Sequence, residues 1–435
     1  PPRSTLFPYT TLFRSYWPPS GGAGVFRWLK FVKYFRSYGW EPIIYTPENP
    51  EAPAEDESLL KDIPDGIEVL KTRIWEPYNI YKFITGKRNQ RIGVSFVSQG
   101  KKKGFLHGFM VWLRGNLLIP DPRVFWVRPS VKKLENYIMQ NNIEAIITTG
   151  PPHSMHLIGL KLKKRLNVKW IADFRDPWTN IDFYRELKLT SVADKIHHRL
   201  ERKVISSADA ILVVSEQMKR EYLPLNPKRI DVITNGFDED EAIVENVKLD
   251  KKFSIAHIGT LNAPRNPHVL WSALSELINE IPSLKEDLAI KLVGQVDFSV
   301  RESINERNLN QYFEHIEFLK HDEAIALQKQ TQVLLLVINN TPNASGILTG
   351  KFFEYLGSGR VVFGVGPSNG NLSDILAKTG VGEMVDYDDL QRAKQIIANY
   401  YSDYKLNKLF QKGGNIEEYS RRSLTGKILK IIEQV

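Results

Sequence analysis

Residues 333–365 read VLLLVINNTPNASGILTGKFFEYLGSGRVVFGV. The apolar run Val333–Asn339 is followed by a glycine-containing loop, a short helical pattern at Lys351–Leu356 and a second apolar run, Val361–Val365. Strands without polar alternation are typical of a parallel sheet that is covered on both faces. A strand, a helix and a strand in this order predict a βαβ unit with a right-handed crossover.

The same alternation continues through the C-terminal half of the chain, which predicts a doubly wound sheet. The other expected strands are Phe253–Thr260, Leu288–Val296, His315–Leu319 and Gly382–Tyr387. The other expected helices are Pro267–Glu280, Arg301–Asn308, Asp322–Lys329, Leu372–Lys378 and Leu390–Tyr401.

The N-terminal half has a similar but less regular pattern. Its expected strands are Ile43–Thr46, Ile67–Thr72, Ala145–Thr148, Trp170–Phe174, Ala210–Val214 and Asp231–Thr234. Its expected helices are Val25–Ser37, Val131–Gln140, Met155–Arg165 and Ile196–Ser206, whereas Tyr78–Pro129 is an insertion without a clear period. A chain of 435 residues is long enough for two domains. The predicted fold class is therefore α/β, with two Rossmann-like doubly wound domains that face each other across a cleft.

The domain boundary is expected within Asn235–Lys252, after an Asn-Gly pair and in a run of acidic residues. We therefore divide the chain into an N-terminal domain at 16–245, a C-terminal domain at 246–420 and a terminal helix at 421–435.

The first residues, PPRSTLFPYTTLFRS, resemble the in-frame translation of a common sequencing adapter. Such artefacts are excluded from fold reasoning. We therefore set residues 1–15 aside, expect native sequence from about Tyr16, and expect the first strand of the N-terminal sheet to be largely missing.

The composition excludes several kinds of site and segment. The chain has no cysteine, which excludes disulfides and thiolate metal sites. No apolar run reaches the length of a bilayer span, since His107 and Arg114 interrupt Gly104–Ile119. Basic and acidic residues balance from Lys251 to Val435, so the net charge of +9 arises earlier. Its densest part, Lys82–Arg114, contains no Asp or Glu and is either a membrane-attracting surface or a solvated loop.

Three loops of the N-terminal half carry candidate site residues. Gly21, Gly22 and Gly24 precede an amphipathic helix, where backbone amides could approach a phosphate, although a tight turn explains them as well. His153 follows the expected strand Ala145–Thr148 and either binds a sugar or phosphate or merely begins the next helix. Arg175 and Asp176 follow the next strand and suit a sugar, whereas a structural pair of Arg175 with Asp173 or Asp176 is equally plausible.

Two loops of the C-terminal half carry the more specific candidates. Gly259 and Thr260 end the first strand there, and Arg265 lies where it could reach a diphosphate. In the quoted stretch, amides at the N-terminus of the short helix could hold phosphate, and Glu354 could accept the hydroxyls of a ribose. The candidates in that stretch are Gly346, Leu348, Thr349, Gly350, Lys351 and Glu354.

Seven motifs occur in the order and spacing of a known group: YWPPSGGAG, TTGPPHS, IADFRDPW, ADAILVVS, ITNGFD, HIGTL and GKFFEYLGSGR. On these motifs the chain resembles bacterial glycosyltransferases of the GT-B fold in the retaining family 4, from Tyr16 to about Leu424. The resemblance implies that the glycine loop faces the phosphates of the donor, that Arg265 binds the diphosphate and that Glu354 holds the ribose. It also places His153, Arg175 and Asp176 near the transferred sugar, and packs the terminal helix towards the first domain.

The sequence departs from the family pattern at two positions. The family has a glutamate eight residues before the one at Glu354, where this chain has Gly346. It also has an arginine directly after the strand-end glycine, where this chain has Thr260. One contact to the donor sugar and one to the diphosphate are therefore in doubt.

The reaction implied by the resemblance is transfer of a sugar from a nucleoside diphosphate to a glycan or lipid-linked acceptor, with retained configuration and without a required metal or other cofactor. We expect a cytoplasmic protein, bound peripherally to the inner face of the membrane through Lys82–Arg114, that acts in surface polysaccharide or lipopolysaccharide synthesis. A nucleic-acid partner is not expected. The alternatives are a nucleotide-sugar epimerase on the same fold and a non-catalytic scaffold protein.

Overall fold

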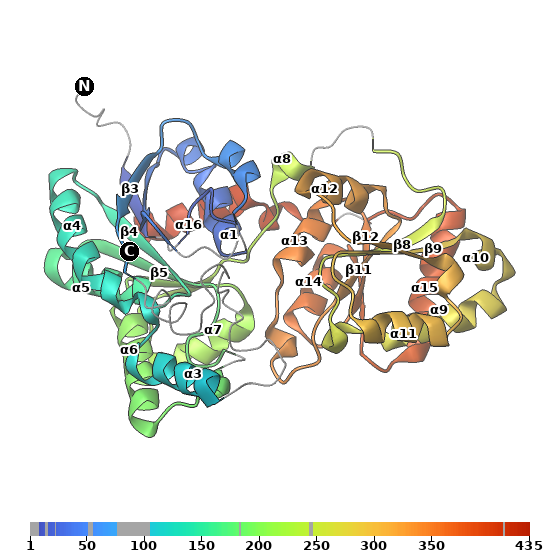
Figure 1. The fold of residues 1–435 in the computed structure, drawn as a ribbon. Helices are drawn as coiled ribbons and strands as arrows, with labels where there is room; N and C mark the ends of the chain where they lie inside the picture. Colours follow the sequence, from blue (N-terminus) through green and yellow to red (C-terminus); the bar gives the residue numbers. More distant parts are fainter. Residues whose placement is uncertain are drawn as a thin grey trace. The chain divides into compact units, whose positions relative to one another are not determined.

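The computed structural model describes residues 8–13, 16–21, 23–50, 55–75, 105–181, 184–242, 247–411 and 414–435. The chain forms two compact units (Figure 1). Unit 1 consists of Pro1–Thr234 and Arg422–Val435, and unit 2 consists of Asn235–Arg421. The chain thus passes from unit 1 to unit 2 after Thr234, at the first residue of the expected range Asn235–Lys252 and before the division that we placed after residue 245.

Unit 1 is built on a parallel sheet with the strand order β3-β2-β1-β4-β5-β6-β7. The chain runs from β1 through β2 to β3 at one edge of the sheet, and then from β4 through β5 and β6 to β7 at the other edge. This path is that of a doubly wound fold. The strands are β1 (Tyr9–Phe13), β2 (Glu41–Pro47), β3 (Glu68–Thr72), β4 (Ala145–Gly150), β5 (Lys169–Phe174), β6 (Ala210–Val213) and β7 (Ile230–Val232).

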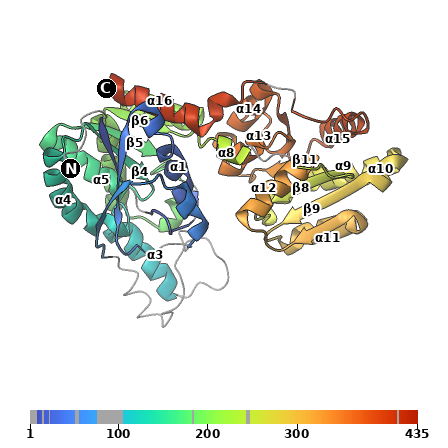
Figure 2. The same ribbon diagram turned by 90° about the horizontal axis from the view of Figure 1, so that it is seen from above.

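Helices cover both faces of this sheet, and each face has its own apolar core. Figure 2 shows α4 and α5 on one side of the sheet and α1 on the other. The helices of unit 1 are α1 (Ala23–Val32), α3 (Phe105–Leu117), α4 (Val127–Gln140), α5 (Ser154–Leu166), α6 (Ser191–Ser207), α7 (Glu216–Tyr222) and α16 (Arg421–Gln434).

The strand β1 corrects one expectation. We expected the first strand of this sheet to be largely missing, but Tyr9–Phe13 fills its position between β2 and β4, within the segment that we set aside. Four of the five residues of YTTLF favour strands, and so the segment suits a place inside a sheet. The adapter origin of residues 1–15 stays a prediction.

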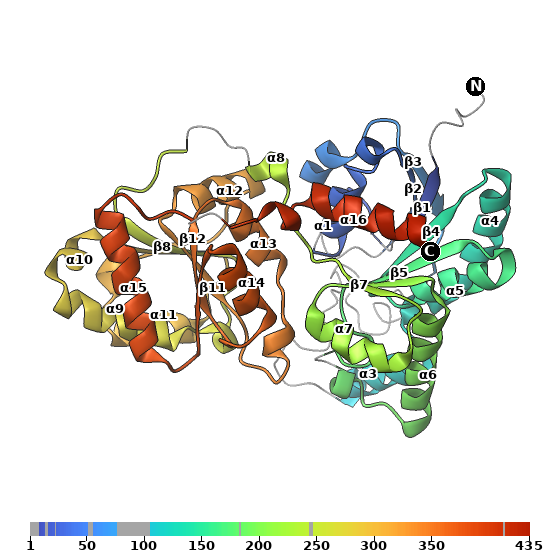
Figure 3. The ribbon, with the colours of Figure 1, turned by 180° about the vertical axis from the view of Figure 1, so that it is seen from behind.

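The terminal helix α16 packs in unit 1. Leu424, Ile428 and Ile432 are buried in the same core as Trp28 of α1. Figure 3 shows α16 beside α1. The hydroxyl of Thr425 donates a hydrogen bond to the carbonyl oxygen of Phe31 at 3.3 Å. The last residues of the chain therefore complete the core of the unit that contains the first ones.

Unit 2 repeats the topology with a parallel sheet in the order β10-β9-β8-β11-β12-β13. The strands are β8 (Phe253–Ile258), β9 (Leu288–Val293), β10 (Phe313–Ile316), β11 (Val333–Val337), β12 (Val361–Val365) and β13 (Gly382–Val385). The helices are α8 (Glu239–Ala242), α9 (His268–Glu280), α10 (Pro282–Asp287), α11 (Phe298–Glu306), α12 (His321–Gln330), α13 (Gly350–Gly357), α14 (Asn371–Thr379) and α15 (Leu390–Lys405).

The predicted fold class is confirmed, because both units are Rossmann-like with parallel sheets and helices on both faces. The insertion Tyr78–Pro129 contains the helix α3, which the sequence did not predict. None of the helices in the described ranges combines the length and apolar character that a transmembrane span requires.

Candidate functional site

The strands β8 and β11 form the switch point of the unit 2 sheet. They are neighbours, but the chain leaves β8 towards β9 on one side and leaves β11 towards β12 on the other. Ligands of doubly wound folds bind at such a point, outside the carboxyl ends of the strands. Gly259 directly follows β8, and Asn339 follows β11 by two residues.

The helix α13 begins close to the switch point. The hydroxyl of Thr349 accepts a hydrogen bond from the amide of Phe352 at 3.3 Å and so caps the helix. Gly350 is exposed, and a Cβ atom built on it would meet nothing within 4 Å. The space in front of the first helical turn is therefore open, and the partial positive charge of a helix N-terminus faces it.

The side chain of Lys351 reaches back from α13 to the end of β8. Its Nζ lies 3.4 Å from Nε2 of His257, a buried residue of that strand. Burial lowers the pKa of Lys351 to about 8, the charge of Arg265 lowers it as well, and the charge of Glu354 raises it. Lys351 is thus a half-buried ammonium group whose pKa lies close to neutral pH. A second cation and one carboxylate act on it.

Arg265 lies in the loop after β8 and is fixed by a residue that follows β11. Its Nε donates a hydrogen bond to Oδ1 of Asn339 at 2.7 Å. In the described part of the chain, its Nη1 and Nη2 groups make no hydrogen bond. Burial lowers the pKa of Arg265, but a guanidinium stays charged at physiological pH. This fork of donors is therefore available to an anion at the switch point.

Glu354 lies one turn further along α13 and is exposed. Its carboxylate forms no hydrogen bond or ion pair with the described residues. The neighbouring Tyr355 is buried and its hydroxyl accepts a hydrogen bond from the amide of Ile258 at 3.1 Å, which ties α13 to the end of β8. The predicted trio of Arg265, Lys351 and Glu354 thus lies together at the carboxyl end of the unit 2 sheet.

The other candidates of unit 2 have different surroundings. The amide of Gly346 donates to the carbonyl oxygen of Asn343 within a short turn, so that it is not free for a phosphate. Leu348 is half-buried against the core beside α13, and Thr260 is exposed. Gly346 is therefore a turn residue in this structure. Binding of a phosphate by its amide would require this hydrogen bond to break, and the role stays a prediction.

In unit 1, the corresponding switch point lies between β1 and β4. Arg175 links the two loops that follow these strands. Its Nη1 donates to the carbonyl oxygen of Gly24 at 3.1 Å, its Nε donates to that of Gly150 at 3.3 Å, and its Nη2 donates to that of Pro151. Arg175 thus fixes the glycine loop against the loop before His153. Gly21 is buried, whereas Gly22 lies outside the described residues.

His153 lies in an aromatic stack beside this switch point. Its ring is parallel to that of Trp178, with 4.7 Å between the ring centroids, and it is only 8% exposed. Burial and the nearby His156 and Arg175 hold the pKa of His153 well below its usual range. Its Nδ1 and the Nε2 of His156 are buried without a hydrogen-bond partner among the described residues. His153 is therefore a neutral ring, and one of its two nitrogens has no hydrogen-bond partner in the described part of the chain.

Asp173 is a buried structural residue and does not pair with Arg175. It accepts hydrogen bonds from Arg27 at 2.8 Å, from the indole of Trp28 at 2.7 Å and from the hydroxyl of Thr149 at 2.7 Å. Arg27 also donates to the carbonyl oxygen of Thr234, the last residue before unit 2. The structural pair therefore involves Arg27, which the sequence did not suggest, and Asp176 is exposed.

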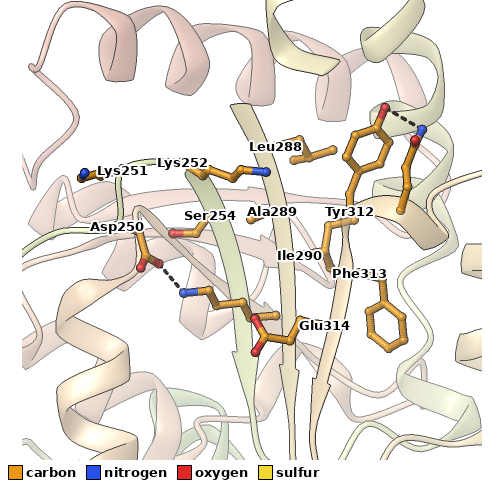
Figure 4. A pocket seen from close by; sticks show the side chains of 12 residues that line it. Asp250, Lys251, Lys252, Ser254, Leu288, Ala289, Ile290, Tyr312, Phe313 and Glu314 are labelled. Atoms are coloured by element: carbon orange, nitrogen blue, oxygen red, sulfur yellow. Dashed lines mark hydrogen bonds and ion pairs between the residues drawn. The ribbon is translucent and has the colours of Figure 1, made fainter. Parts of the chain in front are cut away.

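A hollow of about 390 Å³ lies at the other end of the unit 2 sheet (Figure 4). It is lined by residues at the amino ends of β8, β9 and β10, among them Ser254, Leu288 and Phe313. Its Asp250 and Lys291 are already paired at 2.7 Å. This hollow is therefore distinct from the candidate site, which lies at the carboxyl ends of the strands.

The site residues resemble no metal centre. Within the described ranges, no group of three or more His, Asp or Glu side chains is arranged to hold a metal ion. The sequence did not predict the contacts of His257, Asn339, His156 and Arg27. Only the first has a sequence signal, because it opens the motif HIGTL.

Known proteins share this architecture. Residues 88–241 match the model of Glycosyltransferase Family 4. No curated protein matches the sequence. A glycosyltransferase from Rickettsia africae is 16% identical with a TM-score of 0.61, and the match covers 98% of both chains. Anabaena HepE in complex with UDP-glucose is 13% identical with a TM-score of 0.57, over 98% of this chain and 100% of the other.

The fold is GT-B. A putative UDP-N-acetylglucosamine 2-epimerase from Listeria monocytogenes also has it, at 10% identity and a TM-score of 0.55, over 98% of this chain and 96% of that one. The fold alone is therefore common to sugar transfer and epimerisation. The family match over residues 88–241 supports a glycosyltransferase.

Proposed function

We propose that this chain transfers a sugar from a nucleoside diphosphate sugar to an acceptor hydroxyl with retained configuration. The observation that carries the proposal is the group of Arg265, Lys351 and Glu354 at the switch point of unit 2. Two cations beside a helix N-terminus suit a diphosphate. An exposed carboxylate one helical turn away suits the two hydroxyls of a ribose. The nucleotide would therefore lie along α13.

This arrangement suits the chemistry of sugar transfer. The bond from the anomeric carbon to the phosphate oxygen breaks, and a bond to the acceptor oxygen forms on the same face of the sugar. The acceptor proton passes to the departing phosphate oxygen. Charge develops on the diphosphate in this step, and Lys351 and Arg265 stabilise that charge. The step requires no metal ion, because the two cations and the helix N-terminus supply the positive charge.

The acceptor would meet unit 1, near the loops that Arg175 joins. In this proposal His153 and Asp176 lie near the acceptor or the transferred sugar. A glycan or lipid-linked acceptor of surface polysaccharide or lipopolysaccharide synthesis fits the aromatic and basic residues near α3. Phe109 of α3 is 47% exposed and Leu117 is 66% exposed. Of the basic segment Lys82–Arg114, the part before residue 105 lies outside the described residues.

Binding of nucleoside diphosphates tests the ribose assignment. We expect Glu354→Ala to weaken binding of the preferred one of UDP, GDP and ADP at least tenfold, because a charged hydrogen-bond acceptor contributes about 1.5–3 kcal/mol. Glu302 is also an exposed glutamate of unit 2, on α11, and Glu302→Ala is the matched control. Isothermal titration calorimetry measures both. Equal affinity of Glu354→Ala and the wild type would contradict the assignment.

Turnover separates the enzyme from the alternatives. A glycosyltransferase releases nucleoside diphosphate from its donor when an acceptor or water takes the sugar. An epimerase instead produces a changed sugar, which chromatography of the products detects. Failure to release nucleoside diphosphate from any common donor, despite tight nucleotide binding, would favour a scaffold protein.

A further inference from the structure

We infer that His257 is a positioning residue for Lys351. Its neutral imidazole accepts a hydrogen bond from the ammonium group, and the space left by Gly259 receives that group, so that the charge is held at the carboxyl end of β8. The inference rests on the proposed function, in which Lys351 binds the donor diphosphate. Three independent features of the structure support it.

The first feature is the orientation of the imidazole. Nδ1 of His257 lies 2.9 Å from the carbonyl oxygen of Leu335 on the neighbouring strand β11. A carbonyl oxygen cannot donate, so Nδ1 carries the hydrogen. In a neutral ring Nε2 then holds a lone pair, and this is the atom that faces Nζ of Lys351 at 3.4 Å. Burial, followed by the charge of Lys351, lowers the pKa of His257 to about 3, which keeps the ring neutral.

The second feature is the backbone at Gly259. Its φ of +126° is one that residues with a side chain rarely adopt, and a Cβ atom there would lie 2.2 Å from Nζ of Lys351. The amide of Gly259 donates to the carbonyl oxygen of Val293 at 2.7 Å, which holds this backbone in place. The ammonium group therefore occupies space that exists only because residue 259 is glycine.

The third feature is the balance of charge around the ammonium group. The charged groups that act on Lys351 are Arg265 from the loop after β8 and Glu354 from its own helix, and the titratable ring is His257. Burial and a second cation both disfavour the charged lysine. A free lysine side chain would turn to solvent, because it has high rotamer entropy and strong hydration. A hydrogen-bond acceptor at Nε2 of His257 opposes this turn to solvent and holds the ammonium group where an anion can bind to it.

The test is the pH dependence of nucleoside diphosphate binding, measured by calorimetry from pH 7 to 9.5, where the terminal phosphate is already largely ionised. For the wild type we expect constant affinity up to about pH 8 and then a fall of up to tenfold per pH unit, as free Lys351 loses its proton. His257→Phe removes the acceptor that favours the charged lysine, so the fall should begin at lower pH, with affinity about tenfold weaker at pH 8. His257→Gln keeps an acceptor and should bind within about threefold of the wild type.

The controls separate positioning from folding. His268→Phe, at an exposed histidine of unit 2, should bind as the wild type does. In a Lys351→Met background, His257→Phe should cause no further loss of affinity, because the group that it positions is absent. A His257→Phe variant with an unchanged pH profile, or a further loss in the Lys351→Met background, would overturn the inference. A wild-type protein that binds no nucleoside diphosphate would instead overturn the proposed function and the inference with it.

Discussion

Two buried threonines of β1, a strand inside the unit 1 sheet, allow a prediction about stability. A third buried threonine serves as a control for which we expect the opposite effect. Thr10 and Thr11 of β1 are 1% and 0% exposed, and neither hydroxyl has a hydrogen-bond partner among the described residues. Successive side chains of a strand face opposite sides of the sheet, so one hydroxyl lies in each apolar core of the unit. We expect Thr10→Val and Thr11→Val to stabilise the protein.

The magnitude follows from the cost of an unsatisfied hydroxyl. Burial of such a group without a partner costs about 1–3 kcal/mol in proteins. Valine has the branched shape of threonine and an equal or greater preference for strands, so that the substitution strains neither packing nor backbone. At the lower end, the two substitutions together add about 2 kcal/mol. This raises the midpoint of thermal unfolding by roughly 4–8 °C for a unit of this size.

Thr148 of β4 is the matched control, because it is equally buried in the same sheet. Its hydroxyl accepts from the indole of Trp170 at 2.9 Å and lies 2.9 Å from Nδ1 of His156. Thr148→Val leaves both groups unpaired and should destabilise the protein by about 1–3 kcal/mol. Urea unfolding followed by circular dichroism measures all three variants. If Thr10→Val, Thr11→Val and Thr148→Val shift stability in the same direction, the reasoning from unpaired hydroxyls is refuted.

Two more substitutions distinguish ligand-binding from structural roles. The methyl group added by Gly350→Ala would meet no atom within 4 Å, so we expect the free energy of unfolding to stay within about 1 kcal/mol of the wild type. We expect the affinity for nucleoside diphosphate to fall severalfold. An unchanged affinity would contradict binding of the phosphate at the start of α13. Asp173→Asn leaves Arg27 buried without its countercharge and should cost about 3–5 kcal/mol in urea unfolding. Although burial alone would raise it, the charge of Arg27 lowers the pKa of Asp173, so its stabilising effect is present at neutral pH and is lost as pH falls through that pKa. The variant should therefore lose less stability in acid than the wild type does, and equal acid sensitivity would contradict the pairing.

Most of the fold was predictable because local signals agree with the tertiary structure. The runs at Val333–Val337 and Val361–Val365 are apolar throughout, and both are buried central strands. The helix α3 was missed because its apolar residues show no helical period and interrupting glycines weaken the pattern. Gly115 is required there by packing, since a Cβ atom would lie 2.7 Å from Leu189. Such a contact has no trace in the local sequence.

The candidate site was predictable only in part. Arg265, Lys351 and Glu354 follow strands of the unit 2 sheet, and the carboxyl ends of parallel strands meet at one edge. The role of His257 depends on Leu335 and Lys351, which are 78 and 94 residues away in the chain. The partners of a buried histidine are fixed by strand register, and sequence spacing does not give that register across a crossover.

The charged residues at the two switch points differ in their hydrogen-bond partners within the protein, although the two sheets share their topology. In unit 1, Arg27 and Asp173 satisfy each other, and Arg175 uses its donors on three carbonyl oxygens. In unit 2, Lys351 has only a neutral imidazole as a hydrogen-bond partner among the described residues.

A buried charge without a countercharge is costly unless a ligand supplies one. Under the proposed function, the unpaired cations of unit 2 are the groups that bind the anionic nucleotide. In unit 1, the paired charges stabilise the loops instead, and the proposed function assigns those loops to a neutral sugar or an acceptor hydroxyl.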